Sequence, residues 1–260
     1  MIGKEADRRR QFAVCLAEAL AEAGISLLPA MEEQFSVYYE LLARENEVCN
    51  LIGTTDPGLI ARKHIVDCLL CYDQQVFAGA GDLADVGSGA GFPGLVLKIF
   101  CPELNVVLVE SVAKKAGFLT RAVAALGLSG IEVWAERAEL VAHGPAREKF
   151  AIVCSRAVAA MPVLCELCLP LVRVGGWFMA LKGPRWQDEV AWAAFALAEL
   201  GGEVAKVKQA RLPGEAAERI TVYTKKTRST PAKYPRRPGM PEKRPLGWKP
   251  LGRKDENCAE

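Results

Sequence analysis

LADVGSGAGFPGLVLKIF, residues 83–100, decides the fold of this chain. An apolar run leads into a turn rich in glycine, and a second apolar run leaves it. The turn contains Gly87, Gly89, Gly91 and Gly94. Glycine lets the backbone approach a ligand closely, and a turn between a strand and a helix lies at the carboxyl end of a sheet. The stretch therefore predicts a strand, a ligand-binding turn and a helix.

From residue 83 onward, short apolar runs alternate with helical segments. The first five runs cover residues 83–87, 105–110, 131–136, 150–157 and 176–183. This alternation predicts an α/β fold, in which helices cover both faces of a mostly parallel, Rossmann-like sheet. Two further runs, residues 203–213 and 219–226, predict a closing antiparallel pair. The expected sheet therefore has seven strands.

Three regions follow along the chain. Residues 1–80 carry apolar positions at helical spacing and predict an N-terminal helical lobe, with Asp56 as the N-cap of its third helix. Residues 81–226 form the predicted ligand-binding α/β domain. Residues 227–260 form a basic, proline-rich tail, in which we expect the prolines to exclude helix and inner strand.

Positive charge is concentrated near the C-terminus. Residues 225–254 hold eleven Lys or Arg and one acid, whereas the rest of the chain has more acids than bases. This asymmetry indicates a polyanionic partner such as a nucleic acid, although a solvated tail that only aids solubility has the same composition. If the tail is a nucleic-acid arm, its removal should lower nucleic-acid affinity and leave cofactor affinity unchanged.

Composition excludes membrane and metal proteins. No apolar stretch reaches the roughly 18 residues that span a bilayer, and the N-terminal segment is typical of an amphipathic helix rather than an export signal. We therefore expect a cytoplasmic protein with no membrane partner. The chain has two CxxC pairs that could hold zinc, Cys68/Cys71 and Cys165/Cys168. Both lie in apolar helical stretches, and the chain has only 2 His. Buried, reduced thiols and no metal site are expected.

The glycine spacing bears on the choice of cofactor. Gly87 and Gly89 fit the dinucleotide pattern G-x-G-x-x-G, but its third position is Phe92. This departure disfavours a nicotinamide cofactor and favours S-adenosylmethionine (SAM), which has an adenosine end and no pyrophosphate. Glu110 follows the second strand, where a carboxylate can accept hydrogen bonds from both ribose hydroxyls, unless it is simply a surface acid.

Further polar residues follow the later strands. Ala138 and Glu139 follow the third strand, where a backbone N–H and an acid could read the adenine edge, although Glu139 could equally cap a helix. Arg156 and Lys182 end the fourth and fifth strands and so lie at the edge of the sheet that carries the glycine turn. Cations at a ligand edge can hold a carboxylate or a phosphate.

The order of these motifs resembles a known family. The segments NLIGTTDP, KHIVD, DVGSGAGFPG, RAE, SRA and ALKG, and the tail segment STPAKYPRRPGMP, resemble the RsmG (GidB) family of bacterial 16S ribosomal RNA methyltransferases. The resemblance implies a class I SAM-dependent methyltransferase fold and methyl transfer to N7 of one guanine in 16S rRNA.

The resemblance also assigns residues. It implies SAM contacts at Gly87, Phe92, Ala138, Glu139 and Arg156, and its other recurrent polar positions fall on Asn50, His64, Arg137 and Lys182. Together with the residues themselves, this predicts that Gly89 and Glu110 also bind SAM, that Asn50, His64 and Lys182 are catalytic, and that Arg137 and the tail residues Arg236 and Arg237 bind RNA. Two positions depart from the family pattern. Glu110 stands where Asp is frequent, and Cys68 stands where Ser is frequent. A longer carboxylate can still reach a ribose, whereas a hydroxyl role at position 68 is in doubt.

A mechanism follows from the implied acceptor. Guanine N7 carries a lone pair and no proton, so no general base is needed, and the enzyme must hold N7, the methyl carbon and sulfur in line. The expected partner is 16S rRNA or the small ribosomal subunit, and a monomer is expected. Two alternatives are an NAD-dependent oxidoreductase on a similar sheet and a non-catalytic RNA-binding protein that uses the basic tail.

Overall fold

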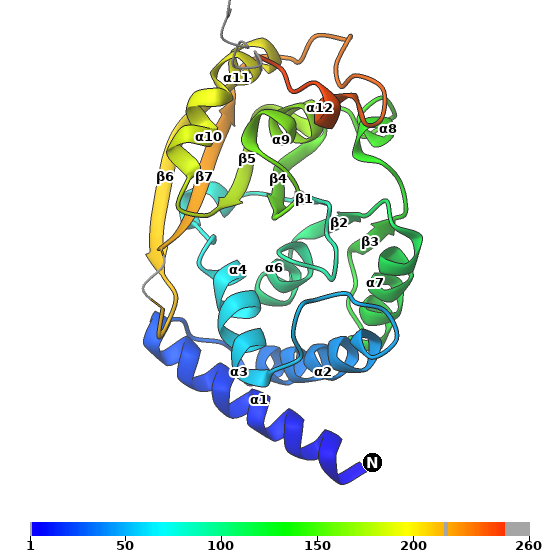
Figure 1. Cartoon of the computed structure of the whole chain (residues 1–260), viewed down its shortest axis with the longest axis vertical. Helices are drawn as coiled ribbons and strands as arrows, with labels where there is room; N and C mark the ends of the chain where they lie inside the picture. Colours follow the sequence, from blue (N-terminus) through cyan, green and yellow to red (C-terminus); the bar gives the residue numbers. More distant parts are fainter. Residues whose placement is uncertain (1, 216–217, 248–260) are drawn as a thin grey trace, which may run out of the picture.

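A seven-stranded sheet of order β3-β2-β1-β4-β5-β7-β6 forms the centre of the computed structural model, which describes residues 2–215 and 218–247 (Figure 1). The strands are β1 (Asp82–Val86), β2 (Asn105–Val109), β3 (Ile131–Trp134), β4 (Phe150–Arg156), β5 (Val172–Lys182), β6 (Gly202–Arg211) and β7 (Glu218–Lys226). The first five strands pair in parallel, and β7 pairs antiparallel with both β5 and β6. The predicted class I methyltransferase sheet is confirmed.

The helices follow the predicted segments closely. They are α1 (Ile2–Ala23), α2 (Pro29–Asn46), α3 (Pro57–Ile60), a π-helical segment η1 (Ala61–Val66), α4 (Asp67–Leu69), α5 (Gln74–Phe77), α6 (Gly94–Phe100), α7 (Ala113–Ala125), α8 (Ala138–Val141), α9 (Met161–Cys168), a 3-10 turn η2 (Leu169–Leu171), α10 (Trp186–Trp192), α11 (Ala194–Leu200) and α12 (Met240–Lys243). Asp56 caps α3 as predicted, because its Oδ1 accepts the Leu59 N–H at 2.8 Å.

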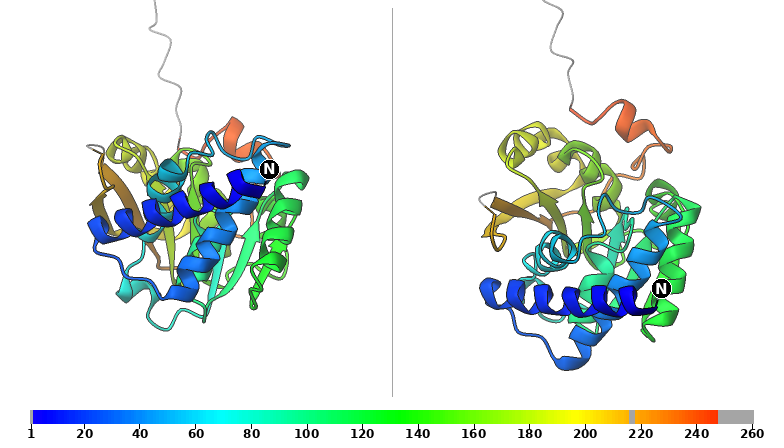
Figure 2. Two further views of the ribbon diagram at one scale, coloured as in Figure 1. Left: turned by 90° about the horizontal axis from the view of Figure 1, so that it is seen from below. Right: turned by 60° about the horizontal axis from the view of Figure 1, so that its bottom comes forward.

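Two apolar clusters lie on the two faces of the sheet. One cluster joins α1–α7 to residues such as Leu83 and Cys154, and the other joins α8, α9 and α11 to Ala84 and Val153. Neighbouring residues on one strand thus bury opposite faces, as the pleat requires. The N-terminal helices therefore share their core with the sheet, and Figure 2 shows α1 and α2 running across the molecule.

Within residues 2–215 and 218–247, no group of His, Cys, Asp and Glu side chains could hold a metal ion, and no helix is long and apolar enough to cross a membrane. Both predicted CxxC pairs are buried free thiols. Burial raises the pKa of the Cys68 thiol to about 12 and that of Cys71 well above its usual value.

The C-terminal segment corrects one expectation. The prolines were expected to exclude helix beyond residue 227, but α12 forms there with Pro241 in its first turn. Proline is tolerated at that point because the first helical N–H groups have no intrahelical partner. The segment also packs on the body, since Thr230, Tyr234 and Leu246 are buried. The rest of the predicted tail, residues 248–260, lies outside the described residues.

Candidate active site

The glycine turn joins β1 to α6 and is tied to β2 by Glu110. Gly87 and Gly89 have φ values of +73° and +58°, a conformation that side-chain-bearing residues rarely adopt. The buried carboxylate of Glu110 accepts the Gly89 N–H at 2.8 Å and the Val112 N–H at 2.8 Å. Glu110 therefore fixes the turn, and each of its oxygens has a second lone pair for a further hydrogen bond.

Gly94 supplies the close packing that the spacing analysis found missing at position 92. A Cβ at Gly94 would lie 2.6 Å from Asp85 Cβ and 2.6 Å from Leu108 Cδ2, so only glycine lets α6 start this close to β1. Asp85 Oδ2 accepts the Gly94 N–H at 2.9 Å, whereas its Oδ1 is buried without a hydrogen-bond partner in the described chain. Burial raises the pKa of Asp85 to about 6. An acid inside an apolar strand was the sequence signal, but no role had been predicted for it.

Arg156 is the centre of a cluster at the end of β4. Its guanidinium donates to Asp67 Oδ2 at 2.8 Å and to His64 Nδ1 at 2.9 Å, and it lies 4.9 Å from the centroid of the Phe92 ring. The His64 and Phe92 rings stack with centroids 4.8 Å apart. The fold thus brings together three of the predicted site residues, from η1, the glycine turn and β4.

The contact with Arg156 determines the tautomer of His64. A guanidinium only donates hydrogen bonds, so Nδ1 must be the acceptor and Nε2 carries the proton. Burial, together with the positive charges of Arg156 and Lys63, lowers the pKa of His64 to about 4. His64 is therefore a neutral hydrogen-bond donor near pH 7.

Lys182 holds the loop that follows β4. Its ammonium donates to the Ala159 carbonyl at 2.8 Å and to Glu189 Oε2 at 2.6 Å, and Glu189 also accepts the Met161 N–H at 2.9 Å. Ala157, in the same loop, has a φ of +56°. Lys182 fixes the path of this loop, and it also lines the large cavity described below.

A first cavity lies between the glycine turn and α8. Its apolar walls include Val86, Val109, Ala138, Val158 and Leu167. Its charged lining residues are Glu136, Arg137, Glu139 and Glu242, so carboxylates outnumber cations. We call it the acidic cavity. Apolar walls suit an adenine ring, and an excess of carboxylates suits a cationic sulfonium ligand, so the chemistry of these residues fits SAM. The cavity has a volume of about 60 Å³, so it could hold only part of the ligand.

The predicted adenine-reading residues lie at this cavity. Ala138 begins α8, and the side chain of Glu139 is 1% exposed. Glu139 accepts hydrogen bonds from Arg137 at 2.7 Å and from the Gly239 N–H at 2.9 Å. These contacts hold the pKa of Glu139 below its usual value, against the effect of burial. Arg137, predicted to bind RNA, is thus engaged with Glu139 and lies 3.8 Å from Glu242.

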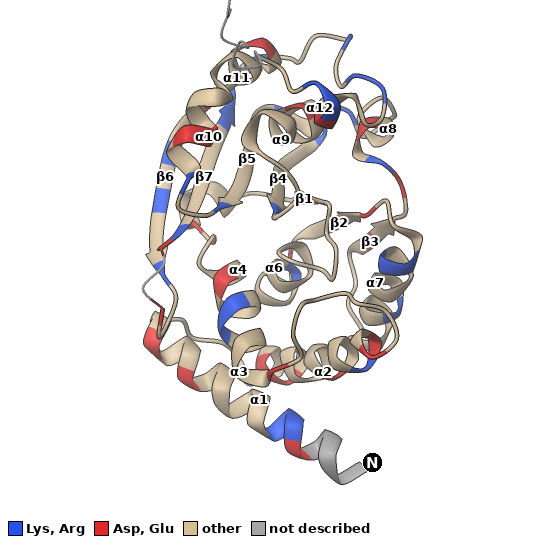
Figure 3. Cartoon of the chain, in the orientation of Figure 1, with Lys and Arg blue, Asp and Glu red and all other residues tan. Residues whose placement is uncertain are grey.

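A second cavity of about 650 Å³ lies beyond β4. Its charged lining residues are Asp67, Arg156, Lys182, Arg185, Glu189, Lys208 and Arg219, five cations against two carboxylates. We call it the basic cavity, and His64 and the 157–160 loop also line it. Val158 lines both cavities. Figure 3 shows the basic residues of β6 and η1 on this side of the molecule.

Sequence comparison agrees with this geometry. The family profile of rRNA small subunit methyltransferase G matches residues 31–218. The chain belongs to this family. A ribosomal RNA small subunit methyltransferase G from Lactobacillus delbrueckii is 45% identical over 88% of this chain and 98% of its own length. The corresponding protein from Staphylococcus epidermidis is 44% identical over 89% of this chain and 97% of its own.

A relative from a third genus has a similar identity. The protein of the same name from Pelotomaculum thermopropionicum is 44% identical over 90% of this chain and 99% of its own length. An rRNA methylase of known structure from Streptococcus thermophilus is 16% identical over 64% of this chain and 97% of its own, with a TM-score of 0.45.

As a member of the methyltransferase G family, this chain is a SAM-dependent methyltransferase, so the oxidoreductase and the non-catalytic alternatives no longer apply.

The remaining predicted residues lie away from both cavities of this methyltransferase. Asn50 is exposed in the loop between α2 and α3, and the described lining of neither cavity includes it. Arg236 forms hydrogen bonds with the buried Glu166, whereas Arg237 is exposed. Their catalytic and RNA-binding roles stay predictions. Arg185, Lys208 and Arg219 were not predicted from the sequence, because no motif marks them and only the antiparallel β6–β7 pair brings the last two to the basic cavity.

Proposed function

We propose that this enzyme transfers the methyl group of SAM to N7 of a guanine in the 16S rRNA of the small ribosomal subunit. The observation that carries the proposal is a pair of cavities with opposite charge that meet at Val158. An acidic cavity suits a cationic methyl donor, and a basic cavity suits a polyanionic acceptor. Methyl transfer requires the two ligands to meet, and the shared residue marks where they do.

Residues of the acidic cavity would hold the cofactor. SAM supplies an electrophilic methyl group on a positively charged sulfur. Ala138 and Glu139 would contact the adenine. Glu110, which lies between the lining residues Val109 and Ser111, would accept ribose hydroxyls on the lone pairs that Gly89 and Val112 leave unused. Arg156, at the border with the basic cavity, is placed to hold a carboxylate, in addition to Asp67.

Residues of the basic cavity would bind the RNA. Arg219 pairs with Asp67, and Lys182 pairs with Glu189, so these two cations are already oriented. Arg185 is exposed at the rim, and its side chain has no hydrogen bond or ion pair within the described part of the chain. Arg185 is therefore the cation most available to a phosphate.

The state of His64 supports an acceptor atom that has no proton to lose. With Nδ1 accepting from Arg156, His64 cannot act as a general base at neutral pH, and its Nε2–H can donate to guanine O6, the acceptor beside N7. The remaining task is to align N7, carbon and sulfur, and positioning of this kind can contribute about 7–11 kcal/mol. Lys182 contributes by fixing the 157–160 loop that separates the cavities.

Transfer from labelled SAM tests the proposal. We expect methylation of 16S rRNA, tried as free RNA, as partly assembled subunits and as mature subunits, at a single guanine that becomes sensitive to N7-specific chain cleavage. A 16S transcript that contains 7-deazaguanine at the mapped position should accept no methyl group. Methylation of the 7-deaza transcript at the same nucleotide would overturn the assignment of N7, and transfer only to 23S rRNA would overturn the substrate.

A further inference from the structure

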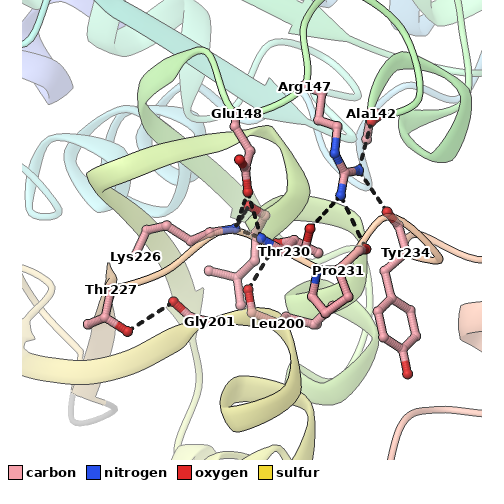
Figure 4. Close-up of polar contacts among 11 residues, drawn as sticks. Ala142, Arg147, Glu148, Leu200, Gly201, Lys226, Thr227, Thr230, Pro231 and Tyr234 are labelled. Atoms are coloured by element: carbon pink, nitrogen blue, oxygen red, sulfur yellow. Dashed lines mark hydrogen bonds and ion pairs between the residues drawn. The ribbon is translucent and has the colours of Figure 1, made fainter.

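Residues 227–247, which we call the strap, run from the end of β7 back across α9 to α8 and end after α12 (Figure 1). Figure 4 shows how the first part of the strap is attached. Arg147 donates to the strap carbonyls of Tyr234 at 2.7 Å and Thr230 at 2.8 Å. Glu148 accepts the Thr230 N–H at 2.6 Å and lies 3.4 Å from the ammonium of the buried Lys226. The strap is thus held at its backbone as well as by its side chains.

A second attachment lies further along the strap. The carboxylate of Glu166, which is fully buried in α9, accepts the backbone N–H of Arg236 at 2.8 Å and two guanidinium hydrogen bonds at 2.8 and 2.6 Å. The side chains of Tyr234 and Leu246 join the apolar cluster of α9 and β4. A bidentate pair on a buried acid is specific in its geometry, so this attachment fixes where the following residues lie.

The strap then reaches the acidic cavity. The Gly239 N–H donates to Oε1 of Glu139 at 2.9 Å, and Glu242 of α12 lines the same cavity as Gly87 and Ala138. Arg137 lies between the two acids, 2.7 Å from Glu139 and 3.8 Å from Glu242. One wall of the cavity therefore comes from a segment that follows the whole sheet in sequence.

We propose that the strap is part of the cofactor site. The Gly239 N–H orients Glu139, and Glu242 forms the wall of the acidic cavity beside the adenosine of SAM. SAM affinity therefore depends on how the strap is attached. The inference rests on the proposed placement of adenosine at Ala138 and Glu139. It replaces the expectation that removal of the tail leaves cofactor affinity unchanged. Glu242 and Arg147 are positioning residues in this proposal, because neither touches the reacting atoms.

Calorimetry with S-adenosylhomocysteine on the full chain tests the inference. Glu242→Ala removes the strap carboxylate from the cavity, and Lys243→Ala, at the next position of α12, is its matched control. Arg147→Met weakens the attachment of the strap at a distance from the cavity. Its control is Lys206→Met on β6, which breaks an ion pair with Asp73. We expect each strap variant to weaken binding roughly fivefold and each control to match the wild type.

Two further readouts separate positioning from general loss of structure. Methylthioadenosine keeps the adenosine and lacks the amino acid, so both strap variants should weaken its binding by the same factor as that of S-adenosylhomocysteine. The KM for SAM should rise while kcat stays unchanged. Unchanged affinity in Glu242→Ala, or a loss confined to S-adenosylhomocysteine, would overturn the inference. A wild-type chain that binds neither ligand would instead overturn the proposed function.

Discussion

The guanidinium of Arg156 donates to Nδ1 of His64 across 2.9 Å, and this contact makes His64 a neutral donor at the border of the basic cavity. The pKa of His64 is lowered to about 4, well below neutrality, chiefly by burial. The structure therefore places a histidine at the site in a state that cannot take up a proton during the reaction.

The first prediction concerns the pH dependence of turnover. Because His64 does not titrate above neutrality and N7 carries no proton, single-turnover rates at saturating SAM and RNA should be nearly constant between pH 7 and 9. Rapid-quench measurement with labelled SAM checks this. A rate that rises about tenfold per pH unit would indicate a general base and a different acceptor atom.

The second prediction concerns Gly87. A Cβ there would lie 2.4 Å from Val158 Cγ2, so Gly87→Ala should displace Val158 and weaken S-adenosylhomocysteine binding by about tenfold or more. Gly127→Ala is the matched control, because Gly127 also has a positive φ, +62°, but has nothing within 4 Å of a Cβ. Val158→Ala in the Gly87→Ala background should restore part of the affinity, measured by calorimetry. Equal losses in Gly87→Ala and Gly127→Ala would mean that backbone strain alone is responsible.

The third prediction concerns the stability contributed by Asp85. Burial raises the pKa of Asp85 to about 6, so the folded state binds the proton of this carboxyl more tightly than the unfolded state does. Proton binding by Asp85 therefore contributes to the free energy of unfolding below pH 4, and this contribution is lost as the pH rises through 6. Asp85→Asn cannot ionise. Its free energy of unfolding, relative to the wild type, should therefore increase by about 2 kcal/mol between pH 4 and pH 7.

Denaturant titrations at the two pH values measure this difference. Asp82→Asn, at the exposed start of the same strand, is the control and should show a much smaller change. A difference for Asp85→Asn that does not depend on pH would show that Asp85 keeps an ordinary pKa in the folded protein.

The fourth prediction concerns the basic cavity. Arg185→Ala should weaken RNA binding and reduce the slope of log K against log salt by about one, because one phosphate contact and its released counterion are lost. Arg173→Ala, exposed near the opposite end of β5, should leave both quantities unchanged. Filter binding to 16S rRNA over a range of salt concentrations makes the comparison. If both variants lose the same affinity, RNA binding is a property of net charge rather than of this cavity.

The fifth prediction separates two neighbouring arginines of the strap. Arg236→Met leaves the carboxylate of Glu166 buried without its partner and should lower the free energy of unfolding by about 3 kcal/mol. Arg237→Met removes an exposed cation and should leave the unfolding free energy unchanged while lowering RNA affinity. Chemical denaturation and RNA binding of the two purified variants test this. A destabilised Arg237→Met would mean that the strap has attachments beyond those described.

Much of the fold follows from local patterns. The strand, glycine turn and helix of residues 83–100, the alternation of apolar runs and helical segments, and the N-cap at Asp56 are all encoded within a few residues of one another. Burial of short apolar runs and the backbone freedom of glycine act locally, so the sheet, its parallel order and its antiparallel end could be predicted.

The site could be predicted only where a residue follows a strand. Parallel strands end at the same edge of the sheet, which is why Gly87, Glu110, Ala138 and Arg156 could be assigned to one region. The third packing glycine was sought at position 92, whereas the fold uses Gly94, because the deciding factor is the space between Asp85 and Leu108 on two different strands.

The sequence by itself determined the family, the sheet and the edge at which we propose that ligands bind. Only the tertiary structure decided that His64 is neutral, that Lys208 and Arg219 reach the basic cavity, and that a basic, proline-rich segment returns to the acidic cavity. The physical reason is that charge composition describes how a segment interacts with solvent and polyanions in general. Whether a particular cation stays exposed depends on a buried carboxylate that lies far away in sequence, as Glu166 does for Arg236.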